Sequence, residues 1–149
     1  MNPDRIDRLP EDPDAQAEMF GHVRQAHSME STEDYVELID DLIRSHGEAR
    51  LVELAERLGV SQPTASKTVT RLQRDGFVTS EPYRSIFLTD KGKALADAAR
   101  ARHDLVYRFL LAIGVSEPTA GRDSEGVEHH VSDETLAAFE RIIAERRRA

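Results

Sequence analysis

The amino-acid sequence predicts a mainly α-helical protein with one short β-hairpin between its helices. Apolar residues recur every three or four positions along several stretches, which is the pattern of amphipathic helices. Capping residues and glycines mark the ends of those stretches. Two short runs of β-branched and aromatic residues, 77–79 and 86–89, flank a turn-forming segment and predict the hairpin.

Length and composition exclude several classes of protein. With 149 residues the chain can form one compact unit, or two small units that share a core. Cysteine is absent, which excludes disulfides, thiolate zinc sites, iron–sulfur clusters and cysteine nucleophiles. No apolar run approaches the ~18 residues of a membrane span, and the first residues lack a basic-then-apolar signal. We therefore expect a cytoplasmic protein without a membrane partner.

Charge is distributed unevenly along the chain. The formal net charge is −8, which argues against a surface that attracts nucleic acid all over. Between Ser61 and Lys93, however, six Lys and Arg residues stand against only three Asp and Glu residues. Such a local basic region is compatible with nucleic-acid binding in an otherwise acidic chain.

Residues 1–30 predict an acidic N-terminal extension. The first 14 residues hold three prolines and five acidic side chains with few apolar groups, so we expect disorder there. A short amphipathic helix is expected from Ala15 to about His27. His22 and His27 are interpreted as surface residues.

The next helix is expected to begin at Ser31, which is placed to cap it with Asp34 at the third helical position. Apolar residues then recur at helical spacing as far as Ile43, and Gly47 follows the end. Asp34 and Glu37 lie three residues apart near the beginning of this helix. Capping and the helix dipole account well for Asp34 and less well for Glu37.

A helix-turn-helix pattern follows. A short helix over 51–58 ends at Gly59, and Ser61 caps a second helix with Pro63 in its first turn. The second helix has an apolar stripe, and no acidic residue occurs from Ser61 to Arg74. This favours a DNA-recognition helix over a helical hairpin of a bundle, because short polar side chains can reach base edges while basic ones meet phosphates.

The predicted hairpin comes directly after this helix, as the wing does in a winged-helix domain. Arg84 near its tip is expected to make a minor-groove or phosphate contact. We therefore expect a winged-helix DNA-binding domain over residues 31–90. The residues predicted to contact DNA are Ser61, Gln62, Thr64, Ser66, Lys67, Thr70, Arg71 and Arg84.

Residues 91–149 predict an all-helical region. A long helix is expected over 90–113, with Gly114 at its end. The segment 116–121 is a loop or the start of another helix, and Ser132 is placed to cap the last helix.

A group of metal-ligand residue types precedes that last helix. Glu125, Glu128 and His129 stand at positions i, i+3 and i+4, so on a helix they share one face. Carboxylates with one imidazole suit Mn²⁺ or Fe²⁺, although a solvated acidic face would show the same spacing. His103, on or beside the apolar face of the long helix, is by itself most simply a buried core histidine.

Taken together, these motifs resemble the diphtheria-toxin-repressor-like family of metal-dependent transcriptional regulators, and within it the manganese transport regulators. The likeness covers residues 31–149. It is carried, in order, by Glu33-Asp34-Tyr35-Val36-Glu37, the helix-turn-helix from Ala49 to Gly76, Tyr83-Arg84 with Phe87-Leu88-Thr89, Arg102-His103, and the stretch from Asp123 to Ser132.

The resemblance implies a homodimeric repressor of manganese uptake genes. Such a protein is not an enzyme, takes no small organic substrate, and binds a pseudo-palindromic double-stranded DNA operator. The C-terminal region is then a metal-binding and dimerisation domain. The implied ligands of a Mn²⁺ site with one or two ions are Asp34, Glu37, His103, Glu125, Glu128 and His129.

Three alternatives stay open. Iron-responsive relatives typically carry a softer Cys or Met where this chain has Asp34, and continue into a further C-terminal domain, yet Fe²⁺ can occupy many Mn²⁺ sites. A metal-independent winged-helix regulator would leave the ligand set unexplained. A di-metal carboxylate enzyme usually has two Glu-x-x-His motifs, but Glu128 is followed three positions later by Val131.

Overall fold

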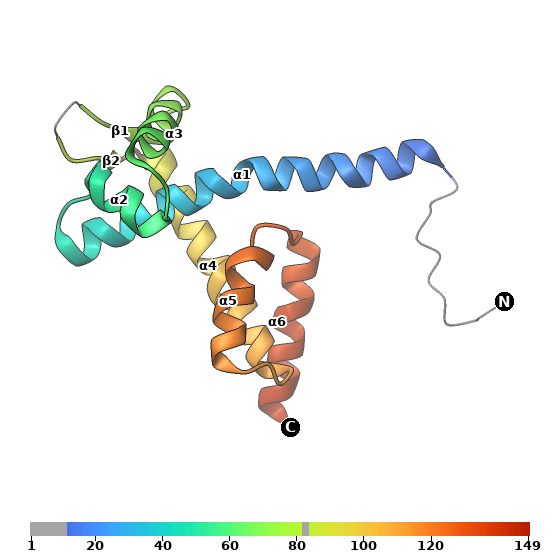
Figure 1. The fold of residues 1–149 in the computed structure, drawn as a ribbon. Coiled ribbons are helices and arrows are strands. Elements are labelled where there is room, and N and C mark those ends of the chain that lie inside the picture. The colour runs from blue at the N-terminus through green and yellow to red at the C-terminus, as the bar shows by residue number, and fades with distance from the viewer. Residues whose placement is uncertain (1–11, 82–83) are drawn as a thin grey trace.

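The computed structural model describes residues 12–81 and 84–149. The described residues form six helices and one two-stranded antiparallel sheet, in the order α1, α2, α3, β1, β2, α4, α5, α6 (Figure 1). The predicted fold class, mainly α with a β wing in the N-terminal half and an all-helical C-terminal half, is confirmed. No described helix is both long enough and apolar enough to span a membrane.

α1 (Pro13–His46) is one continuous helix of 34 residues, so the predicted boundary at Ser31 is wrong. Asp12 caps the helix instead, because its Oδ1 accepts the backbone N–H of Asp14 at 3.0 Å. Between Pro13 and His46 the sequence offers no second proline and a single glycine, so nothing stops the helix from propagating through Ser31. The predicted disorder of the N-terminal tail falls mostly on residues 1–11, outside the described residues.

The helix-turn-helix has the predicted boundaries. α2 (Leu51–Leu58) ends at Gly59, whose φ of +69° lies in the left-handed region that favours glycine. α3 (Gln62–Arg74) begins after Ser61, whose Oγ accepts the backbone N–H of Thr64 at 3.2 Å.

The wing is a short hairpin. β1 (Val78–Thr79) pairs antiparallel with β2 (Phe87–Leu88), and Val78 stands opposite Leu88. An isolated bridge between Ala49 and Ile86 ties the wing to the segment before α2.

Three helices complete the chain. α4 (Asp90–Ala112) begins after Thr89, whose Oγ1 accepts the backbone N–H of Gly92 at 3.1 Å, and α6 (Asp133–Arg148) begins at the predicted cap Ser132. The segment after Gly114, for which a loop or a helix was expected, forms α5 (Glu117–Val127). Gly92 allows α4 to begin close to β1, because a Cβ at this position would lie 2.0 Å from the carbonyl oxygen of Phe77.

Two apolar cores are joined by α1 and α4. The first lies under the helix-turn-helix and includes Ile39, Leu54 and Leu72, all fully buried. The second holds α4 against α6, and the rings of Phe109 and Phe139 stack there with centroids 3.8 Å apart. α4 runs from the wing to the second core. α1 packs across α4, and its N-terminal part extends beyond the bundle that α4, α5 and α6 form (Figure 1). Where α1, α4 and α5 meet, polar side chains are buried.

Candidate metal centre

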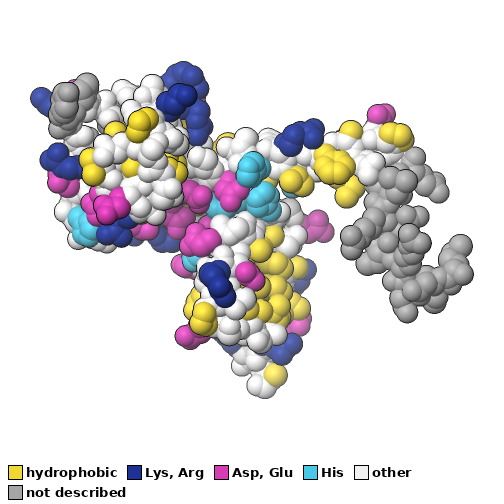
Figure 2. Space-filling model, in the orientation of Figure 1, with side chains coloured by type: hydrophobic (Ala, Val, Ile, Leu, Met, Phe, Trp, Pro, Cys, Tyr) yellow, Lys and Arg dark blue, Asp and Glu magenta, His cyan; other side chains and the backbone are white. Residues whose placement is uncertain are grey.

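Three segments that are far apart in the sequence bring their polar side chains together between the two cores. α1 supplies Asp34 and Glu37, α4 supplies His103, and the C-terminal end of α5 supplies Glu125 with the residues that follow it. In Figure 2 His and acidic side chains gather where α1 passes the helical bundle. The predicted ligand set therefore comes from both halves of the molecule.

The end of α5 keeps its ligand residues on one face. α5 ends at Val127, but Glu128 retains right-handed helical backbone angles, and its N–H bonds to the carbonyl of Ser124 at 3.2 Å. The N–H of His129 bonds to the carbonyl of Gly126 at 3.3 Å. This last tightened turn preserves the one-face arrangement that the spacing predicts.

Glu128 lies at the centre of the group with only 1% of its surface exposed. Its Oε2 is 3.1 Å from Nδ1 of His103, and its Oε1 is 3.3 Å from Nε2 of His129. Glu125 approaches from the solvent side, with its Oε1 3.6 Å from the same nitrogen of His103. A carboxylate this deeply buried is retained only where a positive charge balances it.

His129 is held between two carboxylates of α1. Its Nε2 lies 2.9 Å from Oδ1 of Asp34, and its Nδ1 lies 2.5 Å from Oε2 of Glu33. Arg102 then contacts the other oxygen of Glu33 at 2.7 Å. The Glu33 carboxylate thus fixes the orientation of the imidazole and leaves Nε2 directed toward the centre.

Glu33 lies at the candidate centre, although the sequence does not predict a role for it. The resemblance implies its neighbour Asp34 as a ligand and assigns no role to Glu33. The sequence holds one indirect signal: Glu33 and Arg102 each come directly before a candidate ligand, Asp34 and His103. Its contact with His129 spans 96 positions and could not be read from local spacing.

The electrostatics of the site show an excess of negative charge. The close carboxylate of Glu128, 3.1 Å from Nδ1, raises the pKa of His103 to about 9. Burial alone would lower the pKa of His129, but contacts with Asp34 and Glu33 raise it to about 10. Burial, together with the charges of Glu128 and Glu125, raises the pKa of Glu37 to about 7. Each change favours the protonation state that lessens the negative charge of the cluster.

The donor set fits a divalent cation. Among the described residues, Nδ1 of His103, Nε2 of His129 and both carboxylate oxygens of Glu128 are buried without a well-formed hydrogen bond. Four carboxylates with two imidazoles match hard or borderline ions such as Mn²⁺ and Fe²⁺. His103, Glu125 and Glu128 offer ligand atoms within 4.8 Å of one another. His103, which taken alone suggested a satisfied core histidine, instead lies half-buried in this group.

Most of the predicted DNA-contacting residues are exposed on the winged-helix unit. Ser61, Gln62, Thr64, Ser66, Lys67 and Thr70 are exposed along α3, while Ala65, Val69 and Leu72 face the core. Lys and Arg side chains gather over this part of the molecule in Figure 2. Arg84 is exposed on the wing and pairs with Glu81 at 3.0 Å.

Arg71 differs from the expectation of an exposed side chain. It is half-buried, and its Nη1 donates to Oγ1 of Thr32 at 3.1 Å. Thr32 is buried on α1, next to Glu33. The guanidinium therefore ties α3 to the part of α1 that carries the metal-centre residues.

Comparison with known proteins agrees with this arrangement. The family model described as "Iron dependent repressor, N-terminal DNA binding domain" matches residues 27–86, and "Iron dependent repressor, metal binding and dimerisation domain" matches residues 89–148. The transcriptional regulator MntR of Escherichia coli O157:H7 is 56% identical over 122 residues, which cover 82% of this chain and 79% of that protein. The HTH-type transcriptional regulator MntR of Geobacillus kaustophilus is 43% identical over 102 residues, covering 68% of this chain and 72% of that protein.

A solved structure has the same fold. A manganese-dependent transcriptional repressor in complex with manganese superposes with a TM-score of 0.69 at 31% identity, over 76% of this chain and 52% of that chain. The chain thus spans about half the length of this solved relative.

These relatives are transcriptional regulators, which confirms the prediction of a regulator rather than an enzyme. The chain belongs to the iron-dependent repressor family, with the family's DNA-binding domain followed by its metal-binding and dimerisation domain.

Proposed function

We propose that this chain is a cytoplasmic Mn²⁺-dependent DNA-binding repressor of manganese uptake genes, which acts as a homodimer. Its metal ligands are the six residues predicted above: Asp34, Glu37, His103, Glu125, Glu128 and His129. Its DNA contacts come from α3 and the wing. The observation that carries the proposal is that Nε2 of His129 lies 2.9 Å from Oδ1 of Asp34 on α1 and 3.3 Å from Oε1 of the buried Glu128, so that ligands from the two halves meet.

This convergence suggests how a metal ion regulates DNA binding. Asp34 and Glu37 lie on α1, and the core of the DNA-binding domain packs against the same helix. A cation held by both halves would fix α1, and with it α3, relative to the C-terminal domain. A metal that prefers the DNA-competent arrangement shifts the population toward it only by its difference in affinity for the two states.

A homodimer would present two copies of α3. The short polar side chains at the beginning of α3 would then read base edges in two major grooves one helical turn apart. Lys67 and Arg84 would contact phosphates, which fix position without specifying sequence. A two-fold symmetric protein of this kind requires a pseudo-palindromic operator.

Manganese is favoured over iron by the hardness of the donor set. The sequence has no cysteine that could serve as a ligand. Asp34 stands where iron-responsive relatives typically carry a softer residue. The manganese-dependent repressor named above, 31% identical to this chain, supports the same choice. The name of the matched family keeps Fe²⁺ as the second candidate effector.

The test is DNA binding by the metal-stripped protein. After EDTA treatment, binding to DNA upstream of a manganese uptake gene is titrated with Mn²⁺, with anaerobic Fe²⁺ and with Zn²⁺. Salt is held constant because phosphate contacts make the affinity strongly salt-dependent. We expect binding that requires Mn²⁺ and is reversed by chelator.

Glu128→Ala removes the carboxylate that both imidazoles approach, so we expect it to abolish Mn²⁺-dependent DNA binding. Glu117→Ala is the matched control, because Glu117 lies exposed in the first turn of α5, away from the ligands. The proposal is wrong if Glu128→Ala retains the full Mn²⁺ response. DNA binding by wild type that is indifferent to every metal would favour a metal-independent regulator.

A further inference from the structure

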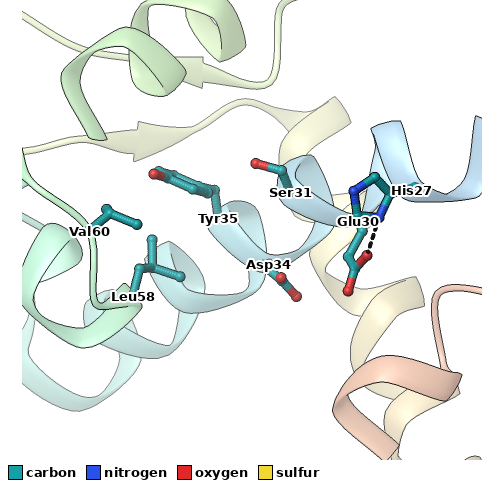
Figure 3. Close-up of a pocket in the computed structure, with 7 residues that line it drawn as sticks. All are labelled: His27, Glu30, Ser31, Asp34, Tyr35, Leu58 and Val60. Carbon is teal, nitrogen blue, oxygen red and sulfur yellow. Dashed lines mark hydrogen bonds and ion pairs between the residues drawn. The ribbon is translucent and has the colours of Figure 1, made fainter. Parts of the chain in front are cut away.

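A second group of metal-ligand side chains lies outside the predicted ligand set. Nδ1 of His27 and Nε2 of His130 approach the same carboxylate oxygen, Oε2 of Glu30, at 3.1 Å and 3.5 Å. His27 and Glu30 are one turn apart on α1, whereas His130 follows α5 in the C-terminal half. Figure 3 shows His27 and Glu30 directed toward each other on the face of α1 that also carries Asp34.

The spacing of these atoms suits a shared cation. The three side chains offer one ligand atom each within 4.8 Å of one another. Ligand atoms bound at ~2.0–2.2 Å to one ion lie roughly 3–4 Å apart, because tetrahedral or octahedral geometry fixes the angles between them. The two distances from Glu30 already fall in this range, so only small rotations of the three side chains are needed.

A helical ion pair does not account for all three residues. His27 and Glu30 at i and i+3 could pair by themselves on a solvated helix face. His130, however, reaches the same oxygen from a segment 100 positions away, and two imidazoles that compete for one oxygen gain less than two separate partners would provide. An ion between them would satisfy all three groups.

We propose that His27, Glu30 and His130 form a further divalent-cation site, distinct from the six-residue centre and beside it. The site has two imidazoles and one carboxylate, the ligand set typical of borderline transition-metal ions such as Zn²⁺, Co²⁺ and Fe²⁺. The main centre has four carboxylates and two imidazoles, so it is the harder of the two. The two sites therefore prefer different cations.

The surroundings leave room for the remaining ligands. A pocket of about 310 Å³ opens beside the group and is lined by His27, Glu30, Asp34 and, at its other end, by Tyr35, Leu58 and Val60 (Figure 3). Water in this pocket can complete the coordination shell of an ion held by three side chains. Glu30 also lies within ligand distance of Asp34 and His129, so the proposed site adjoins the main centre.

Occupation of this site would connect the N-terminal part of α1 to the C-terminal domain. Upstream of Glu30, α1 extends past the bundle with Met19 and Phe20 about 60% exposed (Figure 1). A cation held by His27 and His130 would add a link between that part of α1 and the end of α5. The main centre links the two halves one to two turns farther along the same helix.

The test counts bound ions in the full-length protein. Metal-stripped protein is dialysed to equilibrium against Zn²⁺ alone, and the zinc per chain is measured by elemental analysis over a range of free Zn²⁺. We expect the His27→Ala/His130→Ala variant to bind one ion per chain fewer than wild type. His27→Ala alone, at a side chain that is 79% exposed, should weaken that ion's binding by at least about tenfold.

His22→Ala is the matched control, because His22 is an exposed histidine on the same helix, and it should bind as many ions as wild type. Glu30 is left unchanged since it also adjoins the main centre. Equal zinc content in wild type and the double variant would overturn the proposal, as would an equal loss in His22→Ala. The outcome is separate from that of the main centre: we expect the double variant to keep Mn²⁺-dependent DNA binding, which Glu128→Ala is expected to lose.

Discussion

Single side chains decide how the main centre is organised, and Glu33 is the clearest case. This carboxylate contacts Nδ1 of His129 on one side and Arg102 on the other. Burial would raise its pKa, but the contacts with His129 and Arg102 lower it, so Glu33 stays ionised. An ionised Glu33 holds the imidazole with Nε2 available to a cation, as outer-shell carboxylates do in many metal sites.

We expect Glu33→Gln to weaken Mn²⁺ binding by ~10–100-fold, because the amide keeps the shape of the side chain and loses the charge that orients His129. Affinity is measured by competition with a chelator. Glu56→Gln, at an exposed position on α2, is the control and should bind Mn²⁺ as wild type does. Unchanged Mn²⁺ affinity in Glu33→Gln would mean that Arg102 and the fold alone orient the imidazole.

The raised pKa values of the ligand side chains predict that metal binding releases protons. In the metal-free protein the pKa values of His103 and His129 are raised to about 9 and about 10, and that of Glu37 to about 7. At pH 7 both imidazoles are then protonated, and Glu37 is partly protonated. A metal ligand must be deprotonated, so binding should release about two to three protons per chain.

We therefore expect the apparent Mn²⁺ affinity to rise with pH from 6 to 8. Calorimetric titration in buffers with different ionisation enthalpies measures the released protons directly. Glu128→Ala, which lacks the carboxylate that holds the His103 proton, should release fewer protons and bind Mn²⁺ more weakly. A binding enthalpy that does not depend on the buffer would contradict the predicted release.

Between elements, the contact of α1 with α4 rests on a buried carboxylate. Asp40 is 5% exposed and is approached by Nζ of Lys93 at 3.1 Å, Nη1 of Arg100 at 3.0 Å and Nε of Arg44 at 3.1 Å. Burial would raise the pKa of Asp40, but hydrogen bonds from Lys93 and Arg100 lower it. This cluster holds the helix with Asp34 and Glu37 against the helix with His103.

We expect Asp40→Asn to lower the free energy of unfolding by about 2–3 kcal/mol at neutral pH. This is below the usual 3–5 kcal/mol for breaking a buried pair, because Lys93 and Arg100 still reach water. Asp97→Asn is the control: Asp97 contacts the same two cations from an exposed position, and its loss should cost no more than ~1 kcal/mol. Urea denaturation of the metal-free proteins measures both values.

The contribution of Asp40 should also depend on pH in a defined direction. Because its pKa is lowered in the folded state, the unfolded state binds the proton more readily in acid. The stabilisation is therefore fully present above the ordinary Asp pKa of 3.8 and is lost as the pH falls below it. The difference between wild type and Asp40→Asn should shrink accordingly in acid, and a difference that stays constant would exclude this mechanism.

The helices also show which elements local sequence can predict. Local side-chain or backbone chemistry explains three end signals, and each lies at the helix end or start that it predicted: Gly59, Ser61 and Ser132. Ser31 carries a cap signal as well, yet α1 continues through it. A cap residue permits a helix to begin but does not stop one that is already propagating from Asp12.

At the scale of the whole molecule, the ligand set could be assembled only with the help of family resemblance. Spacing alone placed Glu125, Glu128 and His129 on one face, because those contacts are local. The approach of His129 to Asp34, and of His130 to Glu30, depends on how α5 packs beside α1. No periodicity in the sequence encodes that packing, so Glu33 and the His27–Glu30–His130 group became visible only in three dimensions.

On the proposed function, the metal ion and operator DNA both favour the same arrangement of the two halves, so the binding of one affects the binding of the other. If Mn²⁺ increases the affinity for operator DNA by a given factor, operator DNA must increase the affinity for Mn²⁺ by the same factor. We expect a coupling of ~5–150-fold, the usual range for such linkage. It is measured by titrating Mn²⁺ into the protein with and without saturating operator, at one salt concentration. A scrambled duplex of equal length is the control, since it makes phosphate contacts without base readout. An operator that leaves Mn²⁺ affinity unchanged would separate the metal centre from DNA recognition, and the ligands on α1 would then stabilise the fold without regulating it.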